Sequence, residues 1–200
     1  FSQRNLNCSI DESMARFEPV VQGAKAAGLR VRGAISCAVG CPYQGDVSPD
    51  EVERVVKAYR ALGVDQVSMA DTIGVGTPRQ VQAALERVLR HYPLHEVCGH
   101  YHDTYGQALA NVLASLQMGV RVFDTSVAGL GGCPFAVGAT GNVATEDVAY
   151  LLRGMDIDTG VDFDALVDAG QFISEKLGRA NGSRAARGWL AQRARRQAQA

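Results

Sequence analysis

Apolar residues recur along this chain with two spacings that alternate. After Ser48, apolar side chains return every three or four residues as far as Leu62, which is the spacing of an amphipathic helix. A capping box with proline in its first turn, Ser48-Pro-Asp-Glu, begins this stretch, and Gly63 ends it. Residues 66–70 then form a short apolar run that is typical of a strand. The pattern predicts a helix followed by a strand.

The same unit of helix, terminal glycine, strand and polar loop occurs four times. Strands are expected to begin near residues 30, 66, 96 and 120, and a further helix follows from about Thr145. Strands that alternate with helices pair in parallel through right-handed crossovers. We therefore predict an α/β fold in which ligands bind at the carboxyl ends of the strands, as they do in doubly wound sheets and barrels.

Most of the chemically reactive side chains follow the ends of these predicted strands. They are Cys37, Asp71, His100, His102, Asp124 and Cys133. This agreement between topology and chemistry indicates an enzyme. The last strand leads into residues 128–147, where five glycines and one proline surround Cys133. Such a loop is typical of a mobile catalytic lid, and the alternative is a surface connection with an incidental cysteine.

His100 and His102 are two residues apart on a strand, so their side chains leave the same face. With an oxygen ligand such as the amide of Asn142 they could hold a divalent cation, and Mn, Zn, Fe and Mg all suit that ligand set. Asp71 and Glu146 are candidate acid–base or supporting groups. The structural alternatives are a turn or cap for Asn142, a strand-end hydrogen bond for Asp71 and a first-turn helix charge for Glu146.

Composition narrows the class of protein. The chain of 200 residues carries a formal net charge of −1 and is 46% hydrophobic. It therefore lacks the excess of positive charge that attracts nucleic acid or an anionic membrane surface. Its five cysteines form no Cys-x-x-Cys pair, which favours a reducing cytoplasm over a disulfide framework or a zinc ribbon. No apolar run approaches the roughly 20 residues of a transmembrane helix.

Five ordered motifs resemble those of hydroxymethylglutaryl-CoA lyase, and they extend over nearly the whole chain. In chain order they begin at Val31, Asp71, His102, Gly129 and Gly141, and they read Val-Arg-Gly-Ala-Ile-Ser-Cys-Ala-Val-Gly-Cys-Pro, Asp-Thr-Ile-Gly-Val-Gly-Thr-Pro, His-Asp-Thr-Tyr-Gly-Gln-Ala-Leu-Ala-Asn, Gly-Leu-Gly-Gly-Cys-Pro-Phe-Ala and Gly-Asn-Val-Ala-Thr-Glu-Asp. The resemblance implies a (β/α)8 TIM barrel, of which this chain holds about the last four βα units and the C-terminal helices. We assign residues 1–177 to that lyase domain and residues 178–200 to a basic C-terminal tail or helix.

The resemblance also implies a reaction, which is the cleavage of 3-hydroxy-3-methylglutaryl-CoA to acetyl-CoA and acetoacetate with Mg or Mn. By motif position, the metal ligands are His100, His102 and Asn142, the catalytic groups are Cys133, Asp71 and Glu146, and the supporting residues are Arg32, Gly129, Gly131 and Gly132. The full-length protein is expected to be a homodimer that acts on an acyl-CoA, without nucleic-acid or membrane partners.

Two expectations concern departures from the family pattern. The first strand of the family supplies an aspartate metal ligand and an adjacent arginine, and this chain has no such strand ahead of Phe1. We therefore expect the chain to be the C-terminal part of the enzyme and to be inactive alone. Tyr101, which stands between the two histidines, is expected to point away from the metal.

Two other functions stay open at this point. The first is a condensing acyl-CoA/2-oxo acid synthase, such as an isopropylmalate or homocitrate synthase, or an aldolase of the same superfamily. Those synthases share the paired histidines but need no cysteine in a glycine loop. The second is a non-catalytic barrel remnant with a structural or binding role, and the retention of the expected polar residues argues against it.

Overall fold

The computed structural model describes residues 1–132 and 141–199, and the chain divides into two compact units. The first unit contains Phe1–Asp124. The second contains Thr125–Gly132 and the chain from Gly141 onward. The prediction made for Cys133 therefore lies outside the described residues.

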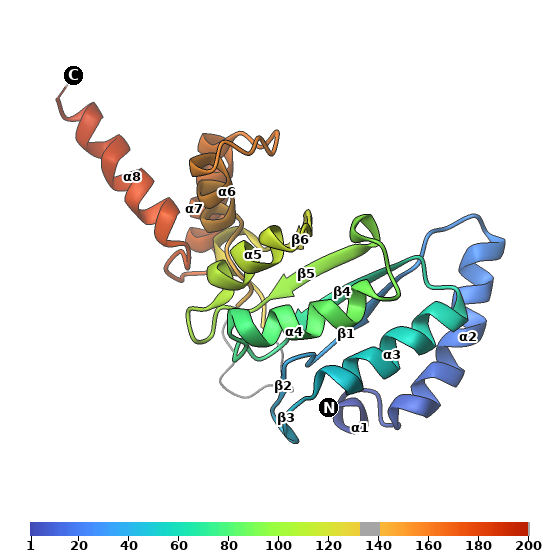
Figure 1. Cartoon of the computed structure of the whole chain (residues 1–200). Coiled ribbons are helices and arrows are strands. Elements are labelled where there is room, and N and C mark those ends of the chain that lie inside the picture. The colour runs from blue at the N-terminus through green and yellow to red at the C-terminus, as the bar shows by residue number, and fades with distance from the viewer. Residues whose placement is uncertain (133–140, 200) are drawn as a thin grey trace. The chain divides into compact units, whose positions relative to one another are not determined.

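A parallel sheet of four strands forms the centre of the first unit (Figure 1). Its strands are β1 (Arg32–Ile35), β4 (Gln66–Asp71), β5 (Val97–Tyr101) and β6 (Val122–Asp124). They lie in the order β1-β4-β5-β6, so each strand pairs with its neighbour in sequence and the order never reverses. The strands of a (β/α)8 barrel follow one another in sequence order, whereas the strand order of a doubly wound sheet reverses at its switch point. The predicted parallel α/β fold is confirmed.

Helices of the first unit begin and end where the sequence marks them. They are α1 (Ser2–Asn5), α2 (Ile10–Ala26), α3 (Pro49–Leu62), α4 (Pro78–Leu89) and α5 (Ala108–Gln117), with a 3-10 turn at η1 (Leu94–Glu96). The capping box of α3 forms, because Ser48 accepts from the Glu51 amide and Glu51 accepts from the Ser48 amide. Gly63 ends this helix with φ 83°, a left-handed conformation that suits glycine. Helices α3, α4 and α5 pack side by side along the sheet (Figure 1).

The core of this unit lies between the sheet and its helices. Val67 and Met69 of β4 are fully buried, as are Val56 of α3 and Leu85 of α4. Burying one aliphatic side chain of this size contributes about 1.5–3 kcal/mol. Every residue of β4 after Gln66 is buried, so this central strand is covered on both faces. It gives the polar residues at its carboxyl end a rigid base.

Two local features differ from the sequence-based expectations. Residues 37–43 are not only a loop, because β2 (Gly40–Cys41) and β3 (Gly45–Asp46) form a short antiparallel hairpin. Two-residue strands carry no periodicity that a sequence pattern could reveal. Helix α5 begins at Ala108 rather than near Tyr105, because Gly106 takes φ 69° and the Asp103 carboxylate accepts from the Ala108 amide.

The second unit is helical. After the 3-10 turn η2 (Val127–Gly129) it contains α6 (Thr145–Gly154), α7 (Phe163–Lys176) and α8 (Arg184–Gln197). The basic C-terminal segment is thus a helix, and it is anchored by Trp189. The indole packs edge-on against Phe163 with ring centroids 5.0 Å apart, and its Nε1 donates to Asp164 at 2.7 Å. The domain boundary predicted at residue 177 stays a prediction.

No helix among residues 1–132 and 141–199 has the length and apolar character needed to cross a lipid bilayer.

Candidate active site

Asp71 ends β4 with its carboxylate turned onto the following loop. The backbone N–H groups of Gly76 and Val75 donate to its two oxygens at 2.9 and 3.1 Å. A Cβ on Gly76 would lie 3.0 Å from Oδ2, so glycine permits this close approach. Burial raises the pKa of Asp71, and the amide hydrogen bonds offset part of the rise. The central strand therefore ends on a buried carboxyl group with increased basicity.

Asp124, at the end of β6, joins side chains from the other three strands. Its Oδ2 lies 3.2 Å from Nδ1 of His100 and accepts from the Ser68 hydroxyl at 3.0 Å. Its Oδ1 lies 3.2 Å from Nη1 of Arg32. The His100 hydrogen bond, the Arg32 guanidinium and the Ser68 hydroxyl together outweigh burial and lower the pKa of Asp124 to about 2. This network ties β1, β4, β5 and β6 together at the site.

The two histidines lie next to each other, as predicted. Their ring centroids are 5.5 Å apart and the ring planes are inclined by 34°. His100 is half-buried and has its Nδ1 against Asp124, which leaves Nε2 as the nitrogen available to a ligand. His102 is 5% exposed, and its backbone N–H donates to the carbonyl of Asp71 at 3.3 Å. The site thus offers two adjacent imidazoles.

Tyr101 points away from this pair, as expected. The phenol is fully buried, and its hydroxyl lies 2.7 Å from Oγ of Ser115 in α5. Alternate residues of a strand face opposite sides, so β5 presents histidines on one face and the tyrosine on the helical layer.

Asn142, in the second unit, has a buried side-chain oxygen that no other described residue contacts by a hydrogen bond. Its Nδ2 donates to the carbonyl of Leu130 at 3.0 Å, whereas Oδ1 accepts no hydrogen bond from the described residues. Leaving a buried polar atom unpaired costs about 1–3 kcal/mol. An amide oxygen held in this way is a fitting ligand for a hard divalent cation. A metal site that combines Asn142 with His100 and His102 stays a prediction.

The predicted glycines let the chain approach Asn142 closely. Gly131 has φ 97°, and a Cβ there would lie 2.5 Å from Nδ2 of Asn142. Gly129 has φ 63°, and its carbonyl oxygen would lie 1.7 Å from a Cβ on Gly141. Gly132 is exposed and is the last residue described before the gap. Bulkier residues at 131 or 141 would push this loop apart.

Glu146, in the first turn of α6, is fully buried and supports the start of the same loop. Both of its carboxylate oxygens lie 3.0 Å from the backbone N–H of Ala128, which has φ 55° and is itself buried. A Cβ on Gly170 would lie 2.2 Å from Oε1, so α7 also approaches closely. Burial raises the pKa of Glu146, and the Ala128 amide offsets part of the rise. These contacts are those of a structural support, and a catalytic role for Glu146 stays a prediction.

Ser68 is the site residue that the sequence patterns missed. It is a buried hydroxyl in the middle of an apolar strand, and such groups need a hydrogen-bond partner. That signal was present in the sequence, but the partner, Asp124, is 56 residues away. Within the described residues, no three His, Cys, Asp or Glu side chains converge as a metal cluster.

Comparison with known proteins identifies relatives over most of the chain. The family model described as HMGL-like matches residues 1–173. A Pseudomonas aeruginosa protein named 3-hydroxy-3-isohexenylglutaryl-CoA/hydroxy-methylglutaryl-CoA lyase is 58% identical over 191 residues, which are 96% of this chain and 64% of that protein.

Solved structures agree. The crystal structure of a hydroxymethylglutaryl-CoA lyase from Pseudomonas aeruginosa superposes with a TM-score of 0.91 at 58% identity, covering 96% of this chain and 64% of that one. An HMG-CoA lyase from Acinetobacter baumannii was solved with coenzyme A and 3-methylmalate. It superposes with a TM-score of 0.88 at 34% identity, and the match covers 92% of this chain and 60% of that one. This chain therefore spans less than two thirds of the length of these relatives.

Proposed function

The chain belongs to the HMGL-like family, and on that premise we propose that it carries the metal-binding strand of a carbon–carbon lyase that cleaves 3-hydroxy-3-methylglutaryl-CoA to acetyl-CoA and acetoacetate. The adjacent imidazoles of His100 and His102 at the carboxyl end of β5 carry this proposal. The relatives named above are lyases, which favours cleavage over the condensing reaction and over a non-catalytic remnant.

His100, His102 and Asn142 would hold a divalent cation, Mg or Mn. Asp124 lies against Nδ1 of His100 and not Nε2, and Oδ1 of Asn142 has no hydrogen-bond partner among the described residues; both observations support this assignment. A bound divalent cation supplies Lewis acidity, which lowers the pKa of a hydroxyl group that it contacts. Asp124 fixes the orientation of the His100 ring, and Arg32 neutralises the carboxylate that does so.

Asp71 is our choice for the group that accepts the proton of the substrate's tertiary hydroxyl. Burial raises its pKa, which makes its carboxylate a stronger base than an exposed aspartate. Its two oxygens accept hydrogen bonds from the backbone N–H groups of Val75 and Gly76, which hold the carboxylate in place. As the hydroxyl loses its proton, the adjacent carbon–carbon bond breaks, acetoacetate leaves, and the bonding electrons remain on the acetyl-CoA enolate.

The enolate must gain a proton at carbon before it attacks the ketone again. We assign this proton to the thiol of Cys133, because the glycine loop carries it and because a thiol with a pKa of about 8.5 is a suitable donor to an enolate. Glycines at 129 and 131 allow the backbone turns that the loop needs. The glycine loop would also exclude water from the enolate.

A longer substrate is the second candidate. The Pseudomonas aeruginosa relative is named for both 3-hydroxy-3-isohexenylglutaryl-CoA and hydroxymethylglutaryl-CoA, and it is 58% identical to this chain. The two substrates differ in the substituent at C3, so the two candidates share one reaction. A CoA thioester as the ligand, a homodimer of the full-length protein and a cytoplasmic location complete the proposal.

The test joins this chain to the part of the Pseudomonas aeruginosa relative that the match leaves uncovered, and measures acetoacetate with Mg or Mn. We expect turnover by the chimera, none by the 200-residue chain alone, and a loss of at least about 100-fold in kcat for Cys133→Ala. Competing the two thioesters in the same assay identifies the preferred C3 substituent. An unchanged rate for Cys133→Ala, or turnover by the isolated chain, would contradict the account.

A further inference from the structure

The motif that begins at His102 ends on an asparagine that the proposed reaction does not use. Asn111 lies on the buried face of α5, together with Ala108 and Ser115, and all three are fully buried. The Nδ2 of Asn111 donates to the backbone carbonyl of Gly76 at 2.8 Å. Its Oδ1 is also buried, and it accepts no hydrogen bond from residues 1–132 or 141–199.

Stability alone does not explain an asparagine at this position. A buried oxygen that accepts no hydrogen bond costs stability, and asparagine favours a helix less than leucine or alanine does. Leucine has the same branching as asparagine and would suit the buried face of α5 better. The side-chain amide of Asn111 is explained instead by the one contact that its nitrogen makes, which is with the loop after β4.

The loop after β4, residues 72–77, contains two glycines at close approaches. Gly74 has φ 67°, and a Cβ there would lie 2.8 Å from the backbone nitrogen of Thr104. A Cβ on Gly76 would lie 2.6 Å from the Val39 side chain. Both positions therefore exclude a side chain. Glycine has the widest conformational freedom of all residues, so this loop must be fixed by contacts from outside it.

Gly76 is held at both of its ends. Its N–H donates to Oδ2 of Asp71 at 2.9 Å, and its carbonyl accepts from Nδ2 of Asn111 at 2.8 Å. The preceding N–H, that of Val75, donates to the other oxygen of the same carboxylate at 3.1 Å. A shift of Gly76 would therefore move the donors that hold the Asp71 carboxylate.

Asn111 itself rests on a rigid base. Its backbone carbonyl accepts from the Ser115 hydroxyl at 2.7 Å, and the same hydroxyl lies 2.7 Å from the phenol oxygen of Tyr101. Ser115 and Tyr101 are fully buried. A chain of buried hydrogen bonds thus leads from β5 through α5 to the loop after β4, whose elements lie side by side in Figure 1.

We propose that Asn111 is a positioning residue that holds the carboxylate of Asp71 in place through Gly76. It acts by fixing the backbone groups that donate to the two carboxylate oxygens. A group that accepts a proton from the substrate must stay where the hydroxyl is bound, because a displacement of about 1 Å can lower the rate by about 100-fold. This consequence for the rate rests on the proposed function, whereas the hold on the loop does not.

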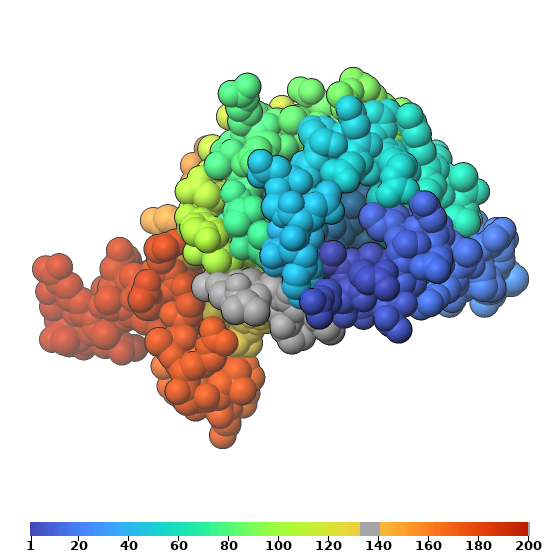
Figure 2. All heavy atoms as spheres, turned by 90° about the horizontal axis from the view of Figure 1, so that it is seen from below, coloured from blue at the N-terminus to red at the C-terminus, as the bar shows by residue number. Residues whose placement is uncertain are grey.

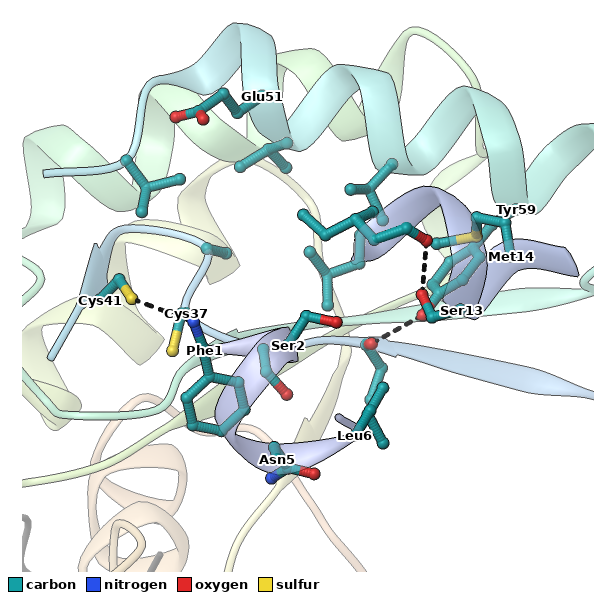
Figure 3. Close-up of a pocket in the computed structure, with 18 of the residues that line it drawn as sticks. Phe1, Ser2, Asn5, Leu6, Ser13, Met14, Cys37, Cys41, Glu51 and Tyr59 are labelled. Carbon is teal, nitrogen blue, oxygen red and sulfur yellow. Dashed lines mark hydrogen bonds between the residues drawn. The ribbon is translucent and has the colours of Figure 1, made fainter. Parts of the chain in front are cut away.

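Tyr59 provides a matched control. Its hydroxyl also donates to a backbone carbonyl in the first unit, that of Ala34 in β1, at 2.9 Å, and the residue is 6% exposed. It lines a pocket of about 240 Å³ beside β1 (Figure 3), and Figure 2 shows the surface hollowed between the N-terminal helices and the segment that follows β1. Asp71, Gly76 and Asn111 do not line this pocket. Tyr59→Phe therefore removes a donor from a backbone carbonyl without touching the loop.

Amide hydrogen exchange in the 200-residue chain, followed residue by residue by NMR, tests the hold on the loop. In Asn111→Leu the N–H groups of Val75 and Gly76 should exchange at least about tenfold faster than in the parent, because a released loop opens more often. Asn111→Ala removes the same donor and should give the same result. The amides of α3 should keep the rates of the parent, and Tyr59→Phe should leave Val75 and Gly76 unchanged.

Kinetics of the chimera described above test the consequence for the reaction. We expect Asn111→Leu to lower kcat by about 10–100-fold while KM stays within about twofold of the parent, and Tyr59→Phe to change neither. Rates are expressed per folded molecule, as measured by circular dichroism. A purely structural role of Asn111 would reduce the amount of folded enzyme and leave kcat per folded molecule as it is.

Three results would overturn the proposal. They are unchanged exchange at Val75 and Gly76 in both Asn111 variants, an equal acceleration at all amides, and a parental kcat for Asn111→Leu in an active chimera. A parent chimera without turnover would instead contradict the proposed function. The exchange rates would then still decide whether Asn111 holds the loop, because they need no turnover.

Discussion

Each of the two units contains a carboxylate that the sequence patterns single out or the structure ties to the candidate residues, and the two carboxylates are held in opposite ways. Asp124 of the first unit is surrounded by His100, Arg32 and Ser68, and its pKa falls to about 2. Glu146 of the second unit is buried against a backbone amide, and its pKa rises. The first carboxylate is stabilised as an anion and the second is not.

This difference separates electrostatic positioning from structural support. A carboxylate paired with an imidazole and a guanidinium can orient a ring and set its basicity. A buried carboxylate without a nearby cation accepts hydrogen bonds from the backbone, but its ionised form is destabilised because it has lost its hydration. We therefore expect Asp124 substitutions to change ligand binding, and Glu146 substitutions to change the stability of the helical unit.

Within this comparison of the two carboxylates, the largest effect is expected for Asp124→Asn. The neutral amide cannot balance the positive charge of the Arg32 guanidinium, and it forms a weaker hydrogen bond with His100 than a carboxylate does. We expect the affinity for Mn²⁺ to fall by about 10–100-fold, as is usual for partners of ligand histidines. The measurement is an Mn²⁺ titration of the chimera described above. Asp168→Asn, which breaks an exposed ion pair with Arg193, is the matched control and should leave the affinity unchanged.

The second effect concerns Gly170→Ala. A Cβ at this position would lie 2.2 Å from Oε1 of Glu146, so the added methyl group displaces that carboxylate from the Ala128 amide. Overpacking of this kind costs about 1–3 kcal/mol. Urea unfolding followed by circular dichroism measures the loss. Gly154→Ala, where nothing lies within 4 Å, should be close to neutral; equal effects at both positions would refute the support role.

Glu146→Gln should give the smallest effect, and its sign depends on pH. The pKa of Glu146 is raised in the folded state, so its contribution to stability is fully present below about pH 4.5 and is lost as the pH rises through the folded pKa. Glutamine keeps an oxygen for the Ala128 amide and has no charge to bury. The variant should therefore gain stability relative to the parent as the pH rises above about 4.5. If the difference in stability between the variant and the parent did not change with pH, burial would not destabilise the ionised form of Glu146.

The sequence predicted the frame of the site because local rules determine it. Gly63 and the capping box at Ser48 mark the ends of α3, and the alternation in β5 separates His100 and His102 from Tyr101. These features depend on neighbours in the chain, which is why pattern reasoning finds them.

The contacts that complete the site depend on tertiary structure instead. Ser68 finds Asp124 across 56 residues, and Glu146 finds an alanine, not a glycine, in the left-handed conformation at position 128. The side-chain nitrogen of Asn142 donates to the Leu130 carbonyl, and its oxygen has no partner among residues 1–132 and 141–199. No spacing in the sequence encodes any of these partners.

The central claim is that the histidine pair on β5 is a metal centre, and Mn²⁺ binding followed by electron paramagnetic resonance tests it most directly. Three single variants of the chimera are compared with the parent: His100→Ala, His102→Ala and His95→Ala, the last of which removes an exposed imidazole near Glu96. We predict that the first two each lower the affinity by at least about 100-fold, beyond the range of supporting residues, while His95→Ala binds as the parent does. Equal affinity in all four proteins would contradict the account.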